Sequence, residues 1–94
     1  MTREEFEYQL KIYEQLKSIL IENFFAREDS IFPEALLDEG LGLDSLEKVR
    51  LFNHLEMEFD IDFYDEEIDK TLNLEDLSNL INNKIPSDQL VLAL

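Results

Sequence analysis

Apolar residues recur at intervals of three and four along most of the chain, a spacing that predicts helices rather than strands. The first such run covers residues 6–24 and follows Thr2 and Glu5, a pair typical of a helix capping box. We expect this helix to end between Phe25 and Arg27. Its predicted buried face consists of Phe6, Leu10, Tyr13, Leu16, Leu20 and Phe24.

A second helix is predicted to begin at Asp44 or Ser45. Asp44 is a favourable N-cap residue, and Glu47 follows at the third helical position. Residues 65–70 have room for one short helix. The predicted buried stripe of the second helix is Leu51, Phe52, Leu55 and Phe59.

The last helix is predicted to start after Asn73, which has Asp76 three residues further on, and to end before Pro86. Its predicted inner face is Leu74, Leu77, Leu80 and Ile81. The chain is therefore expected to be all-α: a small four-helix bundle with three longer helices and one short one. We expect residues 1–94 to form a single domain, with 86–94 as a C-terminal tail.

A long loop should connect the first two helices, because Asp29, Ser30 and Pro33 interrupt the helical pattern. A short helical turn is expected within residues 34–37. The apolar side chains expected to anchor this loop are Ile31, Phe32, Leu36 and Leu37.

The composition is strongly acidic, with 23 Asp and Glu against 8 Lys and Arg and a net charge of −15. Fifteen of the acidic residues lie between Glu28 and Lys70, where only three basic residues occur. Nucleic acids and anionic membranes repel such a chain, so we expect neither as a partner and instead expect proteins with basic surfaces.

Several classes of protein are excluded by residue counts. The absence of Cys excludes disulfides and Cys-based zinc sites, and a single His cannot form a multi-His metal site, so we expect no metal. Apolar stretches are only a few residues long, and the acidic start, Met1 to Glu5, does not resemble a signal peptide. We expect a cytoplasmic monomer.

The only two glycines, Gly40 and Gly42, both lie within five residues before Ser45. Glycine is favoured where the backbone adopts unusual angles or something approaches closely, so this junction is a candidate site. A hydroxyl at the first residue of a helix is exposed, and a phosphate attached to it would meet free N–H groups and the positive end of the helix dipole. The hydroxyl alone favours an ordinary helix-start serine over a modified one.

A catalytic role for Ser45 is disfavoured, because a nucleophilic serine requires a neighbouring base. The only histidine, His54, is nine residues further along the same helix, about 13 Å of helical rise away. We therefore expect no enzyme activity from this chain.

Around Ser45, the sequence resembles the acyl carrier protein family. The family signature is Asp-Ser-Leu after Leu-Gly-x, and residues 41–46 read Leu-Gly-Leu-Asp-Ser-Leu. The resemblance covers about residues 36–81, and the first helix matches only in general pattern. Further matches in register are Val49, Leu55, Glu56, Glu58 to Ile61, Asp65 to Glu67, Leu74, Asp76, Leu77 and Ile81.

The resemblance implies that Ser45, flanked by Asp44 and Leu46, is the attachment point for 4′-phosphopantetheine. A separate phosphopantetheinyl transferase would move this arm from coenzyme A, with Mg²⁺, to the serine oxygen. The thiol of the arm would hold an acyl group as a thioester and present it to acyl-loading, condensing or modifying enzymes with basic docking surfaces. The carrier itself would catalyse no step.

The resemblance also implies a docking surface on the second helix. Leu46 and Val49 fall away from the predicted buried stripe and should be exposed beside the serine. The expected docking residues are Leu46, Glu47, Val49, Arg50 and Glu56.

Two positions on this helix depart from the family. Arg50 stands where an acidic residue is usual, and Asn53 stands where an apolar residue is common. These departures favour a carrier dedicated to one fatty acid, polyketide or other secondary-metabolite pathway. Two alternatives remain open: an aminoacyl or peptidyl carrier, and a carrier-fold interaction domain that is never modified.

Overall fold

The structure is a computed structural model that describes residues 3–85, with side chains from Leu10 onward. It confirms the all-α bundle: between residues 3 and 85 there are helices but no strand, only an isolated bridge between Leu36 and Asn73. The elements are α1 (Arg3–Phe24), a 3-10 turn η1 (Glu28–Ser30), α2 (Ser45–Phe59), α3 (Asp65–Lys70) and α4 (Leu74–Lys84). The predicted cap at Thr2, the predicted stop at Pro86 and the tail lie outside the described residues.

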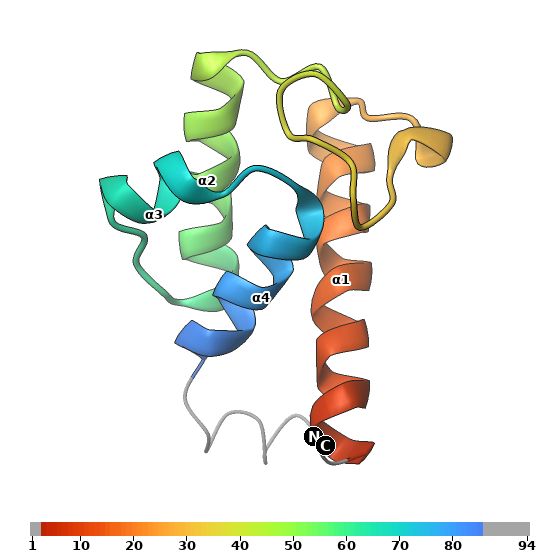
Figure 1. Cartoon of the computed structure of the whole chain (residues 1–94), viewed down its shortest axis with the longest axis vertical. Coiled ribbons are helices and arrows are strands. Elements are labelled where there is room, and N and C mark those ends of the chain that lie inside the picture. Colours follow the sequence, from red (N-terminus) through yellow and green to blue (C-terminus); the bar gives the residue numbers. More distant parts are fainter. Residues whose placement is uncertain (1–2, 86–94) are drawn as a thin grey trace.

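The long helix α1 and helix α2 stand side by side, with α4 crossing in front of them and the short α3 on the outer side of α2 (Figure 1). The C-terminal end of α1 and the N-terminal end of α2 lie at the same end of the bundle, joined by the long loop (Figure 1). This arrangement places Ser45, the first residue of α2, at one end of the molecule.

The buried side of α1 differs from the predicted face. Leu16 and Leu20 are fully buried as expected, but Leu10 is 48% exposed, and Tyr13 and Phe24 are only half-buried. Ile12 and Ile19 are buried instead, so the true face is rotated around the helix axis. The reason is tertiary: α1 makes its main helix contacts with α4, and the position of α4 selects which apolar residues are covered.

Helix α1 ends through a left-handed residue that is not glycine. Phe25 has a φ of 58°, and the next residue, Ala26, donates its N–H to the carbonyl of Leu20 at 3.0 Å. This bond reaches back six residues, one more than the corresponding bond of a Schellman motif, and satisfies a carbonyl near the end of α1. The predicted helix end was therefore correct to within one residue.

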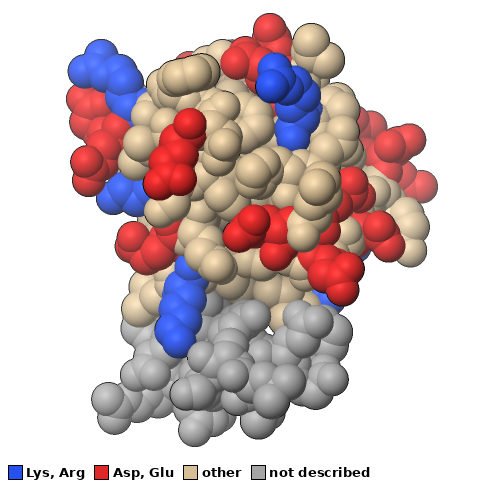
Figure 2. All heavy atoms as spheres, turned by 180° about the vertical axis from the view of Figure 1, so that it is seen from behind, with Lys and Arg blue, Asp and Glu red and all other residues tan. Residues whose placement is uncertain are grey.

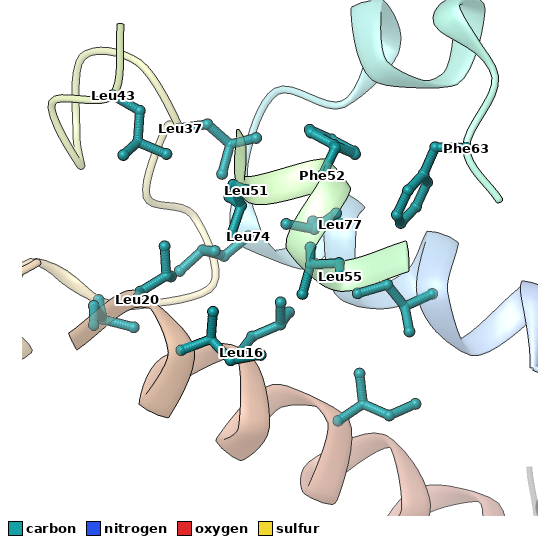
Figure 3. Packing of buried hydrophobic residues seen from close by; sticks show 14 of the residues in the cluster. Leu16, Leu20, Leu37, Leu43, Leu51, Phe52, Leu55, Phe63, Leu74 and Leu77 are labelled. Atoms are coloured by element: carbon teal, nitrogen blue, oxygen red, sulfur yellow. The ribbon is translucent and has the colours of Figure 1, made fainter. Parts of the chain in front are cut away.

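The predicted inner faces of α2 and α4 are confirmed. Leu16 and Leu20 of α1 point towards Leu51 and Leu55 of α2 and Leu77 of α4 (Figure 3). Phe59 and Leu80 are half-buried at the edge of this core. The residues that are at most 1% exposed are Ile12, Leu16, Leu20, Ala35, Leu37, Leu51, Phe52, Leu55, Leu74, Leu77 and Ile81.

The long loop is anchored by some of the expected side chains and not by others. Ile31 and Leu37 are buried, but Phe32 and Leu36 are exposed at 47% and 39%. The helical turn expected within residues 34–37 is absent, and the one short helical turn that forms in this loop is η1. Pairing of the loop backbone with the start of α4 prevents a helical turn there.

This pairing joins residues 33–37 to residues 72–75. The N–H of Leu37 donates to the carbonyl of Leu72 at 3.0 Å, and the N–H of Leu74 donates to that of Ala35 at 3.1 Å. The N–H of Glu75 donates to the carbonyl of Pro33 at 2.8 Å. These bonds satisfy backbone groups near the core and fix the loop that leads to Ser45.

An ion pair joins α3 to α4. The Lys84 ammonium lies 2.8 Å from the Glu67 carboxylate and 5.0 Å from the centre of the Tyr64 ring. The Glu67 carboxylate also accepts the Tyr64 N–H at 2.9 Å. The hydrogen bond from Lys84, followed by that from the Tyr64 backbone, lowers the pKa of Glu67 below its usual value.

This pKa shift predicts a pH-dependent contribution to stability. A carboxyl group whose pKa is lowered by folding stabilises the protein above its unfolded pKa, near 4.3 for Glu, and this contribution is lost as the pH falls through the folded pKa. Lys84→Met should therefore cost about 1 kcal/mol at pH 7, and less as the pH falls below about 4. Urea unfolding at several pH values measures this difference.

The matched control is Lys70→Met, because no carboxylate of the described chain lies within ion-pair distance of Lys70. Its effect on the free energy of unfolding should be smaller. A loss for Lys84→Met that stays constant from pH 7 to pH 3 would contradict the assignment to the Glu67 pair.

Candidate functional site

The two glycines shape the turn that leads into α2, each for a different reason. Gly42 has a φ of +73°, in the left-handed region that disfavours side chains. A Cβ on Gly40 would lie 2.7 Å from the carbonyl oxygen of Leu36 and 2.8 Å from its nitrogen. The turn between them is closed by a 2.9 Å bond from the Leu41 N–H to the Leu36 carbonyl.

Alanine at either glycine should therefore destabilise the protein by distinct routes. Gly42→Ala should cost about 1–2 kcal/mol because it strains the backbone, although the space around it is open. Gly40→Ala should cost about 1–3 kcal/mol because the backbone of Leu36 must move. Urea unfolding measures both costs. A Gly40→Ala variant as stable as the wild type would contradict the close approach of Gly40 to the Leu36 backbone.

Leu43 follows the turn and holds it against the core. Its side chain is 4% exposed, and its N–H donates to the carbonyl of Leu37 at 3.2 Å. Leu43 and Leu37 both point from the loop towards the bundle (Figure 3). Asp44 and Ser45 come directly after this anchor, so the position of Ser45 depends on the core.

The predicted capping box at the start of α2 is confirmed. The Asp44 carboxylate accepts the Glu47 N–H at 2.8 Å, and the Glu47 carboxylate accepts the Asp44 N–H at 3.3 Å. The Asp44 carbonyl accepts the Lys48 N–H at 2.9 Å, which is the first bond of the helix. Ser45 is thus the first helical residue, and its side chain is exposed.

The cap leaves two backbone donors beside the serine hydroxyl. The first N–H groups of any helix lack an intrahelical acceptor, and here the box satisfies those of Asp44 and Glu47. The N–H groups of Ser45 and Leu46 remain at the positive end of the helix dipole. An anionic group attached to the Ser45 oxygen fits these donors, and the exposed hydroxyl leaves room for its entry.

The expected docking residues divide into two groups. Leu46 and Val49 are 68% and 49% exposed, as predicted, and Arg50 is exposed on the same outer side of α2. Glu47 belongs to the capping box. Glu56 is half-buried, and its carboxylate accepts the Phe63 N–H at 2.9 Å, so it also holds the segment before α3.

The two other polar side chains of α2 considered above, His54 and Lys48, are both half-buried. His54 is half-buried and packs edge to face against Phe24, with ring centres 6.5 Å apart. Its position nine residues after Ser45 on one continuous helix keeps it away from the hydroxyl. Lys48 lies one turn after Ser45 and is half-buried.

The described acidic residues are not clustered. Within the part of the chain that the structure describes, no group of three His, Cys, Asp or Glu side chains is placed to hold a metal ion. On the face drawn in Figure 2, carboxylates are scattered rather than gathered, with basic side chains between them. Among the same residues, no helix has both the length and the apolar character needed to span a membrane.

One feature that supports the site was missed at the level of sequence. The exposed Leu36 and Leu72 belong to the paired segments 33–37 and 72–75 that fix the loop before Ser45. Both segments are only four or five residues long and form one isolated bridge, so their sequences are too short to predict a strand. The apolar character of both was the only available signal.

Comparisons with known proteins agree with this geometry. The family model described as "Phosphopantetheine attachment site" matches residues 14–81. The acyl carrier protein of Thermosynechococcus vestitus is 36% identical over 77 residues, which cover 82% of this chain and 95% of that protein. The acyl carrier protein of Campylobacter lari is 34% identical over 74 residues, covering 79% and 96%. The match includes the capped turn, Ser45 and all of α2, and the chain belongs to the acyl carrier protein family, whose members bear a covalently attached 4′-phosphopantetheine.

Proposed function

We propose that Ser45 carries the 4′-phosphopantetheine arm and that the whole chain acts as one acyl carrier domain. The observation that supports this most directly is the exposed Ser45 hydroxyl beside the two uncommitted N–H groups at the start of α2. In the attachment, the serine oxygen forms a bond to the phosphorus of the pantetheine phosphate in coenzyme A. The pyrophosphate bond breaks, 3′,5′-ADP leaves, and the hydroxyl proton passes to a base of the transferase or to water.

In this proposal the carrier positions the Ser45 hydroxyl and does not catalyse the attachment. The capping box holds Ser45 at the surface, and the loop anchored by Leu37 and Leu43 holds the box. When attached, the thiol of the arm carries the acyl group as a thioester. The only histidine, His54, lies nine residues further along α2, and the Asp44 carboxylate accepts the Glu47 N–H in the cap, so in this proposal the transferase activates the hydroxyl.

The partners in this proposal are a phosphopantetheinyl transferase and enzymes that load, condense or modify the acyl group. The net charge of −15 supports attraction to basic docking surfaces and a monomeric carrier through self-repulsion. The exposed Arg50 supports a dedicated pathway rather than general fatty acid synthesis, since it interrupts the acidic surface beside the serine. We place the carrier in the cytoplasm.

Intact-protein mass spectrometry tests the proposal. The chain is incubated with coenzyme A, Mg²⁺ and a transferase of broad specificity, and it should gain the mass of one phosphopantetheine group. The modified protein should then accept an acyl group as a thioester that hydroxylamine releases. A chain that gains no mass with several transferases would instead support an interaction domain that has kept the carrier fold.

A further inference from the structure

The basic residues of this chain differ in whether an acidic partner lies nearby. Lys17 pairs with Glu28 at 3.4 Å, and Arg27 pairs with Asp29 at 3.2 Å. Among the described residues, no carboxylate lies within ion-pair distance of Arg50. In a chain with 23 acidic residues, an exposed guanidinium without an internal partner leaves its charge available to another molecule.

Helix geometry explains why Arg50 has no partner. Side chains three and four residues apart are neighbours on a helix, and for Arg50 these are Leu46, Glu47, Asn53 and His54. Glu47 is the only acidic residue among them, and its carboxylate accepts the Asp44 N–H in the capping box. The capping box thus directs one oxygen of Glu47 towards the Asp44 N–H, and among the described residues Glu47 makes no ion pair with Arg50.

Arg50 lies on an outer stripe of α2 that also carries two exposed apolar side chains, Leu46 one turn before it and Met57 two turns after it. At about 100° per residue, Leu46, Arg50 and Met57 lie within about 40° of one another around the axis of α2. Leu46 is 68% exposed and Met57 is 86% exposed. A partner that covers these two side chains removes water from around Arg50, and a charge pair formed there is stronger than one left in water.

We propose, on the basis of the acyl carrier function proposed above, that the enzyme served by Ser45 presents a carboxylate to Arg50 within an apolar contact to Leu46 and Met57. The remaining surface is acidic, so the rim of that enzyme's docking site is basic. Arg50 then selects against other carrier-dependent enzymes, because a basic residue facing it is repelled. Arg50 is thus a specificity residue of the docking face.

A charge exchange with a defined probe tests this role. The probe is a bacterial malonyl transferase whose docking surface for its own acyl carrier is basic. It is used unmodified and in a second form, in which the basic residue facing the first turns of the carrier's second helix is replaced by Glu. Dissociation constants are measured by calorimetry for the apo chain and for Arg50→Glu. The matched control is Lys11→Glu, which makes the same charge change on the half of α1 far from Ser45 (Figure 1).

The wild-type chain should prefer the Glu-bearing probe, and Arg50→Glu should prefer the unmodified one. The ratio of the two dissociation constants should change by about tenfold or more between wild type and Arg50→Glu. Lys11→Glu should leave the ratio unchanged. A change below about twofold for Arg50→Glu, or an equal change for Lys11→Glu, would overturn the proposal. Phosphopantetheine addition is followed separately by mass, so a failure at Ser45 and a failure at Arg50 give different results.

Discussion

Replacing Ser45 with alanine should abolish the addition of phosphopantetheine completely while leaving the fold intact. The Ser45 hydroxyl is exposed and caps nothing, since the cap is made by Asp44 and Glu47. Loss of an exposed hydroxyl that makes no cap bond changes stability by less than about 0.5 kcal/mol. The measurement is intact mass after incubation with coenzyme A and a transferase, together with thermal unfolding of the same variant.

The matched control for this experiment is Ser18→Ala, which removes another exposed helical hydroxyl, this time from α1. This variant should gain the full mass of the arm. A Ser45→Ala protein that still gains the mass, or a Ser18→Ala protein that does not, would move the attachment site away from Ser45.

Truncating Phe52 should have the largest effect on stability. Its side chain is 1% exposed and meets Phe63 edge to face, with ring centres 4.9 Å apart, so it joins α2 to the segment before α3. Phe→Ala changes in a packed core cost about 3–5 kcal/mol. A small domain has only about 5–15 kcal/mol of stability, so this loss is a large part of the total. Urea unfolding followed by circular dichroism measures it.

Met57→Ala provides the comparison, because Met57 lies on the same helix and is 86% exposed. Its effect on the free energy of unfolding should stay below about 0.5 kcal/mol. A loss below about 1 kcal/mol for Phe52→Ala would contradict the packing of α2 against Phe63. A large loss for Met57→Ala would contradict the exposure of the outer face of α2.

Local signals in the sequence predicted the main helices and their caps well. The N-caps at Asp44 and Asn73 are confirmed, with bonds of 2.8 Å to the N–H groups of Glu47 and Asp76. The special role of Gly40 and Gly42 before Ser45 is also supported by their contacts and angles. Each of these features depends on residues at most four positions apart, so the chain carries the information locally.

The errors concern side chains whose environment is made by distant segments. Leu10 was predicted to be buried and is exposed, whereas Ile12 and Ile19 are buried. Phe32 was expected to anchor the loop and is 47% exposed. Apolar character shows that a residue can be buried, but the packing of α4 on α1 and of residues 72–75 on the loop decides whether it is.

The candidate site combines features that neighbouring residues determine with features that distant segments determine. By itself, the sequence determined that α2 begins at a capped serine after a glycine turn, because caps and turns are built from neighbouring residues. Only the tertiary structure decided where that serine stands, since Leu37 and Leu43 hold its loop in the core and residues 72–75 pair with it. For Arg50, the sequence shows that Glu47 is the only acidic neighbour on its helix, but the tertiary structure decides that no carboxylate of another described segment comes within ion-pair distance.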